Sequence, residues 1–132
     1  DGADPINIRR AMEMELSTAL DRDLAAAAVF RNMGGYAPTI GIIGAVLGLM
    51  QVMGNLAEPS ELGEGIATAF VATIYGVGLA NLLLLPIADR IRALVVKQSH
   101  EKVFWLEGLI AIAEGEHPAA MRMRLQALEN GA

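Results

Sequence analysis

Residues 32–57 read NMGGYAPTIGIIGAVLGLMQVMGNLA, which is twenty-six residues in a row without a charged side chain. After a short acidic segment, residues 65–88 add twenty-four more, GIATAFVATIYGVGLANLLLLPIA. At about 1.5 Å of rise per residue, each stretch is long enough as a helix to cross a hydrocarbon core of about 30 Å. Neither stretch carries the polar stripe of a soluble amphipathic helix. The sequence therefore predicts an all-α fold built on a hairpin of two transmembrane helices.

The composition is compatible with one alternative. Hydrophobic residues make up 54% of the 132 residues, which also suits a soluble helical bundle with two buried central helices. A chain of this length has few residues left to cover two fully apolar helices. We therefore favour the membrane hairpin. No signal peptide opens the sequence, and its first residue is Asp1 where a complete chain would have Met, so we expect a piece of a longer polypeptide.

The charged residues are sorted along the chain. All ten Lys and Arg residues lie outside the hairpin, at Arg9, Arg10, Arg22, Arg31, Arg90, Arg92, Lys97, Lys102, Arg122 and Arg124. Residues 58–64 between the two apolar stretches contain three glutamates and no base. The positive-inside tendency then predicts that both termini are cytoplasmic and that the connecting loop faces outward. Because no basic face is gathered on one surface, nucleic acid is not an expected partner.

These patterns divide the chain into five segments. We predict a cytoplasmic amphipathic helix over 1–35, a transmembrane helix over 36–57, a short extracytoplasmic loop over 58–64, a transmembrane helix over 65–88 and a cytoplasmic helical tail over 89–132. The first helix is capped by Asp4 and Pro5 and is expected to end before Gly34 and Gly35. It presents one apolar ridge for packing, formed by Ile8, Met12, Leu16, Leu20, Leu24 and Ala28. Pro86 predicts a kink, and residues 115–118 predict a break before a short last helix.

Small residues recur at helical spacing in both apolar stretches. They are Gly41, Gly44 and Gly48 in the first, and Thr68, Ala72, Gly76 and Ala80 in the second. Spacings of this kind let helix backbones approach closely in lipid, where packing supplies much of the association energy. We expect these residues to pack the two spans against each other and against further helices.

The inventory of reactive side chains excludes most enzymes. The chain has no Cys, and its two histidines, His100 and His117, lie apart in polar segments with no ligand spacing between them. We therefore predict no catalytic residue, no metal site and no cofactor. The polar groups inside the apolar stretches, Thr73 among them, do not ionise at neutral pH. An ion path through lipid normally needs an ionisable side chain as a relay. If this hairpin lines such a path, the group that carries the proton must come from another helix.

Several segments resemble one known family. They are PTIGIIGAVLGL at 38–49, MGNL at 53–56, PSELG at 59–63, GIATAFVATIYG at 65–76 and LPIAD at 85–89. Together they are similar to the third and fourth membrane helices of flagellar stator A subunits, within the MotA/TolQ/ExbB proton-channel family. The resemblance extends over nearly the whole chain. It places the family's first two spans and the charged segment that touches the rotor upstream of Asp1.

The resemblance implies a function that composition alone does not. Such subunits form a homo-oligomeric ring, expected to be a pentamer, in the bacterial inner membrane. The ring surrounds a single-span, peptidoglycan-binding B subunit whose aspartate carries the ion, and ion flow drives the flagellar rotor. Pro38 and Pro86 then correspond to two prolines linked to torque, and Thr73 to a pore-lining hydroxyl that faces the aspartate. Ala45 stands where sodium-driven members tend to have threonine.

The residue at Ala45 favours protons over sodium, because a dehydrated sodium ion needs several oxygen ligands. Two other readings stay open. Within the family, the chain could be a TolQ/ExbB-type subunit that energises an envelope transport complex. Outside it, the spans could only anchor a cytoplasmic helical interaction module, a reading that gives Thr73 no task.

Overall fold

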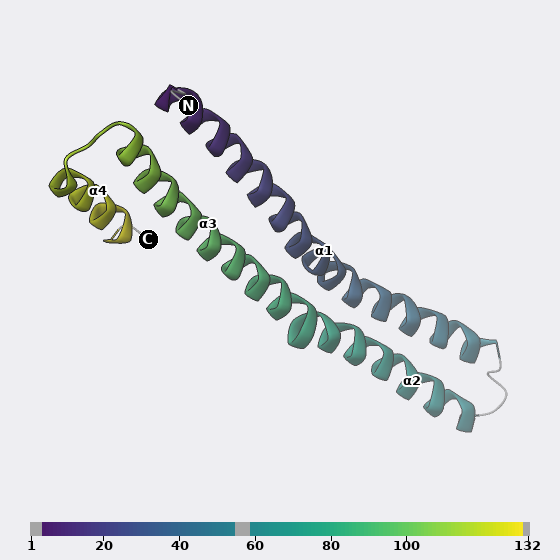
Figure 1. The fold of residues 1–132 in the computed structure, drawn as a ribbon. Helices are drawn as coiled ribbons and strands as arrows, with labels where there is room; N and C mark the ends of the chain where they lie inside the picture. Colours follow the sequence, from purple (N-terminus) through teal and green to yellow (C-terminus); the bar gives the residue numbers. More distant parts are fainter. Residues whose placement is uncertain (1–3, 55–58, 131–132) are drawn as a thin grey trace. The chain divides into compact units, whose positions relative to one another are not determined.

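A computed structural model describes residues 4–54 and 59–130, and all secondary structure in these residues is helical (Figure 1). The elements are α1 (Pro5–Met53), α2 (Pro59–Gly78), the π-helical turn η1 (Leu79–Leu84), α3 (Leu85–Ala113) and α4 (Pro118–Asn130). The predicted all-α class is confirmed. The chain forms two compact units, residues 26–91, called here the hairpin unit, and residues 1–25 with 92–132, called the flank unit.

Helix α1 is longer than the sequence predicts. It begins after Asp4, whose side-chain oxygen accepts a hydrogen bond from the Ile6 N–H at 3.2 Å, and it runs for 49 residues. The prediction that a helix ends before Gly34 and Gly35 is therefore wrong. A glycine inside a helix costs about 1 kcal/mol relative to alanine, which packing can offset. Gly34 is buried in the hairpin unit, where a Cβ would lie 2.7 Å from the Leu85 side chain.

Pro38 also lies inside α1 and not at the start of a separate span. Its ring nitrogen has no hydrogen, so the carbonyl of Gly34 receives no hydrogen bond from it. Prolines are tolerated in membrane helices because neighbouring helices and small local adjustments satisfy the released backbone group. Neither the glycine pair nor the proline therefore separates a soluble helix from a span.

The predicted loop over 58–64 is also corrected. Helix α2 already begins at Pro59, because a proline suits the first helical position, where its missing N–H costs nothing. Residues 55–58, including Glu58, lie outside the described residues. Of the predicted loop, the described part is helical.

Two helical runs in the described residues are long and apolar enough to cross a membrane, Pro5–Met53 and Leu62–Ala113. Only 11% and 6% of their most apolar windows are buried within the chain. Large side chains point outward, with Ile40 66%, Ile74 68% and Leu82 76% exposed. The chain thus does not supply the bundle that the soluble alternative requires, and these faces need lipid or other helices around them.

The hairpin unit is held by a backbone contact between α1 and α2. A Cβ at Gly41 would lie 2.8 Å from the Ala72 carbonyl oxygen and 3.0 Å from the Cα of Gly76. A Cβ at Gly76 would lie 2.7 Å from the Ala37 carbonyl oxygen and 2.8 Å from the Cα of Gly41. Next to this contact Ala37, Ala80 and Leu84 form a small buried cluster with Phe30 against it. The two helices are in contact because both glycines lack side chains.

The flank unit has its own small core. Leu106 is 3% exposed, and Ile110 and Ala111 are each 1% exposed. The predicted ridge of α1 contributes to this unit with partly buried Ile8, Met12, Leu16, Leu20 and Leu24, whereas Ala28, in the other unit, is exposed. Helix α3 ends where the sequence predicts a break. Gly115 has a φ of 71°, and the N–H of Glu116 donates to the Ala111 carbonyl at 3.0 Å, which closes the helix and lets α4 begin.

The glycine contact generates a matched pair of substitutions. Gly41→Ala adds a methyl group against backbone atoms that cannot rotate away, so we expect it to destabilise the folded protein by about 1–3 kcal/mol. Gly35→Ala is the control, since Gly35 is exposed in the same helix and a Cβ there meets nothing within 4 Å among the described residues. It should be neutral or stabilise the helix by up to about 1 kcal/mol. Thermal unfolding in detergent measures both, and equal effects would contradict the proposed role of the contact.

Candidate functional site

The candidate site consists of one residue on each of the two helices α1 and α2 of the hairpin unit. Thr73 and Ala45 are each partly buried, one on each helix. The Thr73 hydroxyl donates a hydrogen bond to the Ala69 carbonyl at 3.1 Å, one turn earlier in α2. Its oxygen keeps lone pairs that can accept a hydrogen bond from another group. Thr73 can therefore serve as an acceptor for a protonated partner, while Ala45 offers no oxygen.

The small residues that the sequence predicts for packing do not all contribute equally. Gly41 and Gly76 make the close contact described above, and Ala72 lies beside it. A Cβ at Gly44 would be 3.5 Å from the Ala72 methyl group, an ordinary contact, and Gly44 is exposed. The close approach of the hairpin is therefore one turn before Gly44, not at Gly44 and Gly48. A role for Gly44 and Gly48 against a further helix stays a prediction.

Ala80, Pro38 and Pro86 lie in the part of the hairpin unit that is farther from the connection between α1 and α2. Ala80 is 1% exposed and packs in the cluster with Ala37, the residue before Pro38. Pro38 is partly buried, and Pro86 is exposed as the second residue of α3. Instead of a simple kink, the chain forms the π-helical turn η1 shortly before Pro86. The torque-linked role that the resemblance assigns to both prolines stays a prediction.

Sequence reasoning missed three features of this unit. Gly34 is seated against Leu84 and Leu85, and Gly65 is so close to α1 that a Cβ would overlap the Val52 side chain. The guanidinium of Arg31 donates to the Asp89 carboxylate at 2.6 Å and joins α1 to α3. The opposite charges of Arg31, directly before the first apolar stretch, and Asp89, directly after the second, are a signal for that pair. No sequence spacing reveals which glycines meet.

The flank unit holds a second polar site. The carboxylate of Glu107 accepts hydrogen bonds from Arg9 of α1 at 2.7 and 3.2 Å, and Arg124 of α4 lies 2.6 Å away. Arg124 also approaches Glu116 at 3.5 Å and Glu114 at 3.8 Å. The hydrogen bonds from Arg9 hold the pKa of Glu107 below its ordinary value, although burial opposes them, and the charge of Arg124 adds to the effect. One carboxylate thus joins three helices.

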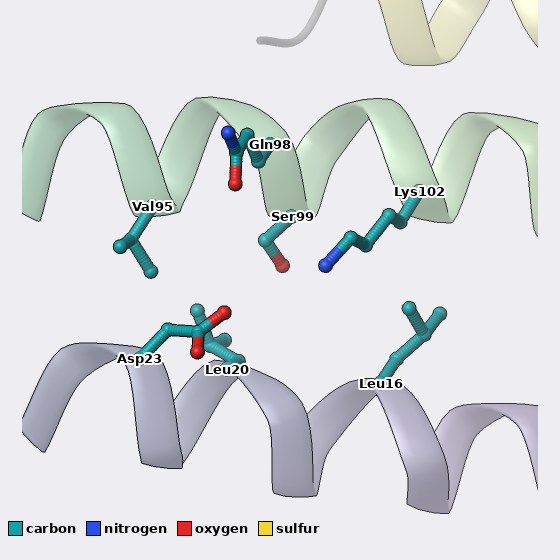
Figure 2. A pocket seen from close by; sticks show the side chains of 7 residues that line it. All are labelled: Leu16, Leu20, Asp23, Val95, Gln98, Ser99 and Lys102. Atoms are coloured by element: carbon teal, nitrogen blue, oxygen red, sulfur yellow. The ribbon is translucent and has the colours of Figure 1, made fainter.

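Two hollows lie in the same unit. A cavity of about 10 Å³, enough for about one water molecule, is lined by Leu16, Leu20, Asp23, Val95, Gln98, Ser99 and Lys102 (Figure 2). A wider, mostly apolar groove of about 350 Å³ is lined by Met12, Glu15, Leu16, Ala19, Lys102, Trp105, Leu106 and Leu109. Neither hollow gathers catalytic side chains. No group of His, Asp and Glu able to hold a metal ion occurs in the part of the chain that the structure describes.

Comparison with known proteins decides the family. Residues 1–103 match the model of the MotA/TolQ/ExbB proton channel family. The chain belongs to this family. Because both membrane helices lie within the match, the hairpin is the shared structure, and the chain is a membrane protein.

Individual relatives are motility proteins. Motility protein A of Bacillus subtilis is 34% identical over 125 residues, which are 95% of this chain and 46% of the relative. Motility protein A of Borreliella burgdorferi is 31% identical over 95% of this chain and 48% of its own length. Chemotaxis protein PomA of Vibrio alginolyticus is 30% identical over 89% and 47%. The chain thus spans about half the length of these relatives.

Solved structures agree with the sequences. The flagellar MotAB stator complex from Bacillus subtilis contains a chain that matches with a TM-score of 0.88 and 33% identity, over 97% of this chain and 50% of that one. The MotAB structure from C. jejuni gives a TM-score of 0.89 at 28% identity with the same coverage. The similarity covers both the hairpin unit and the flank unit.

The Glu107 site generates a pH-dependent prediction. A carboxylate whose pKa is lowered by folding stabilises the folded state above its ordinary pKa of 4.5, and this contribution is lost as the pH falls below that value. Glu107→Gln should therefore increase amide exchange in α4 at pH 7, by about tenfold or less, because Arg124 is partly exposed to solvent.

Hydrogen exchange measured by mass spectrometry on the full-length protein tests this. The difference in amide exchange rate of α4 between Glu107→Gln and the parent should narrow below pH 4.5, where the parent also loses the Glu107 charge. Glu101→Gln is the control. It changes an exposed position of α3, the helix that carries Glu107, and should leave the exchange of α4 unchanged. A difference that persists unaltered at low pH would contradict the role of the Glu107 charge.

Proposed function

We propose that this chain is the part of a flagellar stator A subunit that lines a proton path and helps to couple proton flow to rotation. The observation that carries the proposal is the match of both membrane helices to motility protein A and to a MotAB stator chain. The matching family is described as a proton channel family, which supports the proton as the transported ion. The absence of a hydroxyl at Ala45 supports protons over sodium for the reason given above.

The chemistry of the hairpin supports a shared path. No residue of 32–57 or 65–88 carries a charge, so these helices hold no proton carrier of their own. Thr73 supplies an acceptor oxygen on a partly buried face. We infer that a carboxylate on the membrane helix of a B subunit carries the proton and passes beside Thr73. The apolar outer faces of α1 and α2 suit packing in a ring of copies, which we expect to be a pentamer.

The distribution of charge supports an orientation. We propose that the chain lies in the bacterial inner membrane. Both of its ends would be cytoplasmic, because every Lys and Arg lies before residue 32 or after residue 88 and the connecting segment has none. The rotor would be contacted by a segment outside this sequence. An envelope-energising subunit of the TolQ/ExbB type belongs to the same family, but the relatives described above are motility proteins, which favours the stator.

The orientation can be tested by labelling. In a full-length protein without other cysteines, Ser60→Cys should react with an impermeant thiol reagent added outside the cell, because position 60 follows the outward connection. Ser99→Cys should react only after the membrane is opened, because it lies beyond the inner end of the second span. Equal labelling of both positions from outside would contradict the proposed topology.

The proton path is tested in a full-length complex with its B subunit, reconstituted into vesicles. We expect proton uptake that persists when sodium is replaced by potassium. Thr73→Val keeps the shape of the side chain and removes the oxygen, so it should lower uptake about tenfold or more, the effect of losing one hydrogen bond to a charged or protonated group.

Thr68→Val is the matched control. The Thr68 hydroxyl makes the same kind of bond, to the Glu64 carbonyl at 2.9 Å, but the residue is exposed. It should leave uptake near normal. Uptake unaffected by Thr73→Val would refute the pore-lining role, and a strict need for sodium would refute the proton assignment.

A further inference from the structure

The second span contains one irregular turn whose purpose the proposed function does not explain. The N–H of Leu85, which closes η1, donates to the carbonyl of Ala80, five residues earlier, where an α-helix would use the carbonyl of Asn81, four residues earlier. Pro86 follows at once and has no N–H to continue an α-helical ladder toward Leu82. Figure 1 shows the wider turn between α2 and α3. The turn holds more residues than an α-helical turn of the same height.

The buried residues of the two helices differ in spacing. On α1 the residues that face the second span are Ala27, Phe30, Gly34, Ala37 and Gly41, separated by alternate steps of three and four. Such steps average about 3.5 residues, close to the α-helical repeat, so they keep to one side of a straight helix. A regular α-helix therefore suits this side of the seam.

The second span instead repeats steps of four. Gly76 contacts Gly41, and it is followed by Ala80, Leu84 and Ala88, which are 1%, 9% and 2% exposed. In an α-helix each step of four residues turns about 40° past a full turn, so three steps would carry Ala88 about 120° away from the side of Gly76. Ala88 is nevertheless buried. A π-helical turn has more residues per turn and removes this drift.

The inner end of the span shows the result. Asp89 follows Ala88, and its carboxylate lies 2.6 Å from the Arg31 guanidinium of α1. Both side chains are more than half exposed, so solvent screens the ion pair and it does not itself fix the helix. The Arg31–Asp89 ion pair thus reports the rotational position of the second span at this end. Within η1, the side chain of Asn81 donates to the Val77 carbonyl of α2 at 2.9 Å.

We propose that η1 is a one-residue insertion that sets the rotational phase of the second span. It allows Gly76 to stay against Gly41 while it turns Ala88 and Asp89 toward α1. Leu84 and Ala88 are thereby positioning residues for the inner end of the hairpin. This proposal concerns the fold of the hairpin and does not depend on which ion the complex carries.

A pair of single-residue deletions tests the proposal. Deleting Leu82 removes one outward-facing residue from η1, which should become α-helical and leave the residues on both sides in phase. Deleting Ile40 removes a similarly exposed residue from α1. That helix has only α-helical turns, so Arg31 should rotate by about 100° relative to Gly41.

The measurement is the distance between spin labels at Arg31→Cys and Asp89→Cys in the full-length complex in lipid. Both positions are exposed and accept a label, and replacing the pair removes its own attraction. The Leu82 deletion should insert and keep the parent distance, whereas the Ile40 deletion should lengthen it. The proposal is overturned if the Leu82 deletion does not insert, if it shifts the distance, or if both deletions keep it.

Discussion

The hairpin depends on the contact between two backbones at Gly41 and Gly76. Within lipid, the apolar surface of a helix gains little by contacting another helix, so close packing must supply the association energy. A methyl group on either glycine would meet carbonyl oxygens or Cα atoms at 2.7–3.0 Å. The positions of Ala72 against Gly41 and of Ala80 against Ala37 accompany this contact. Thr73 follows Ala72 directly in α2, so the contact also sets the orientation of the helix that carries Thr73.

The sequence predicts the class of fold and the order of the helices well, because charge-free stretches of this length have few alternatives to membrane helices. It predicts boundaries less well. Gly34, Gly35 and Pro38 indicate an end of a helix by their intrinsic preferences, yet packing on the second span outweighs those preferences. Pro59 suits a loop, although a proline is also a good first residue of a helix. Local signals do not tell which of these uses applies.

The candidate site also has a part that the sequence predicts and a part that it does not. The chemistry of Thr73 could be predicted, since a hydroxyl in an apolar span must satisfy its hydrogen bond, and the structure gives it Ala69 as partner. The glycine pairing and the π-helical turn could not be predicted, because they depend on how two helices face each other. The Glu107 site could not be predicted either, because Arg9 and Arg124 lie far from it in the chain and meet it only after folding.

The placement of the aromatic residues has a practical consequence for spectroscopy. Trp105 is the only tryptophan of the chain, and it is 70% exposed beside the apolar groove of the flank unit. Its ring lies edge-on to Phe104, with centroids 6.2 Å apart. The tryptophan emission of this chain therefore comes from outside the two charge-free stretches, residues 32–57 and 65–88. The emission wavelength records whether water reaches that groove, and it carries no signal from the hairpin unit, where Thr73 lies.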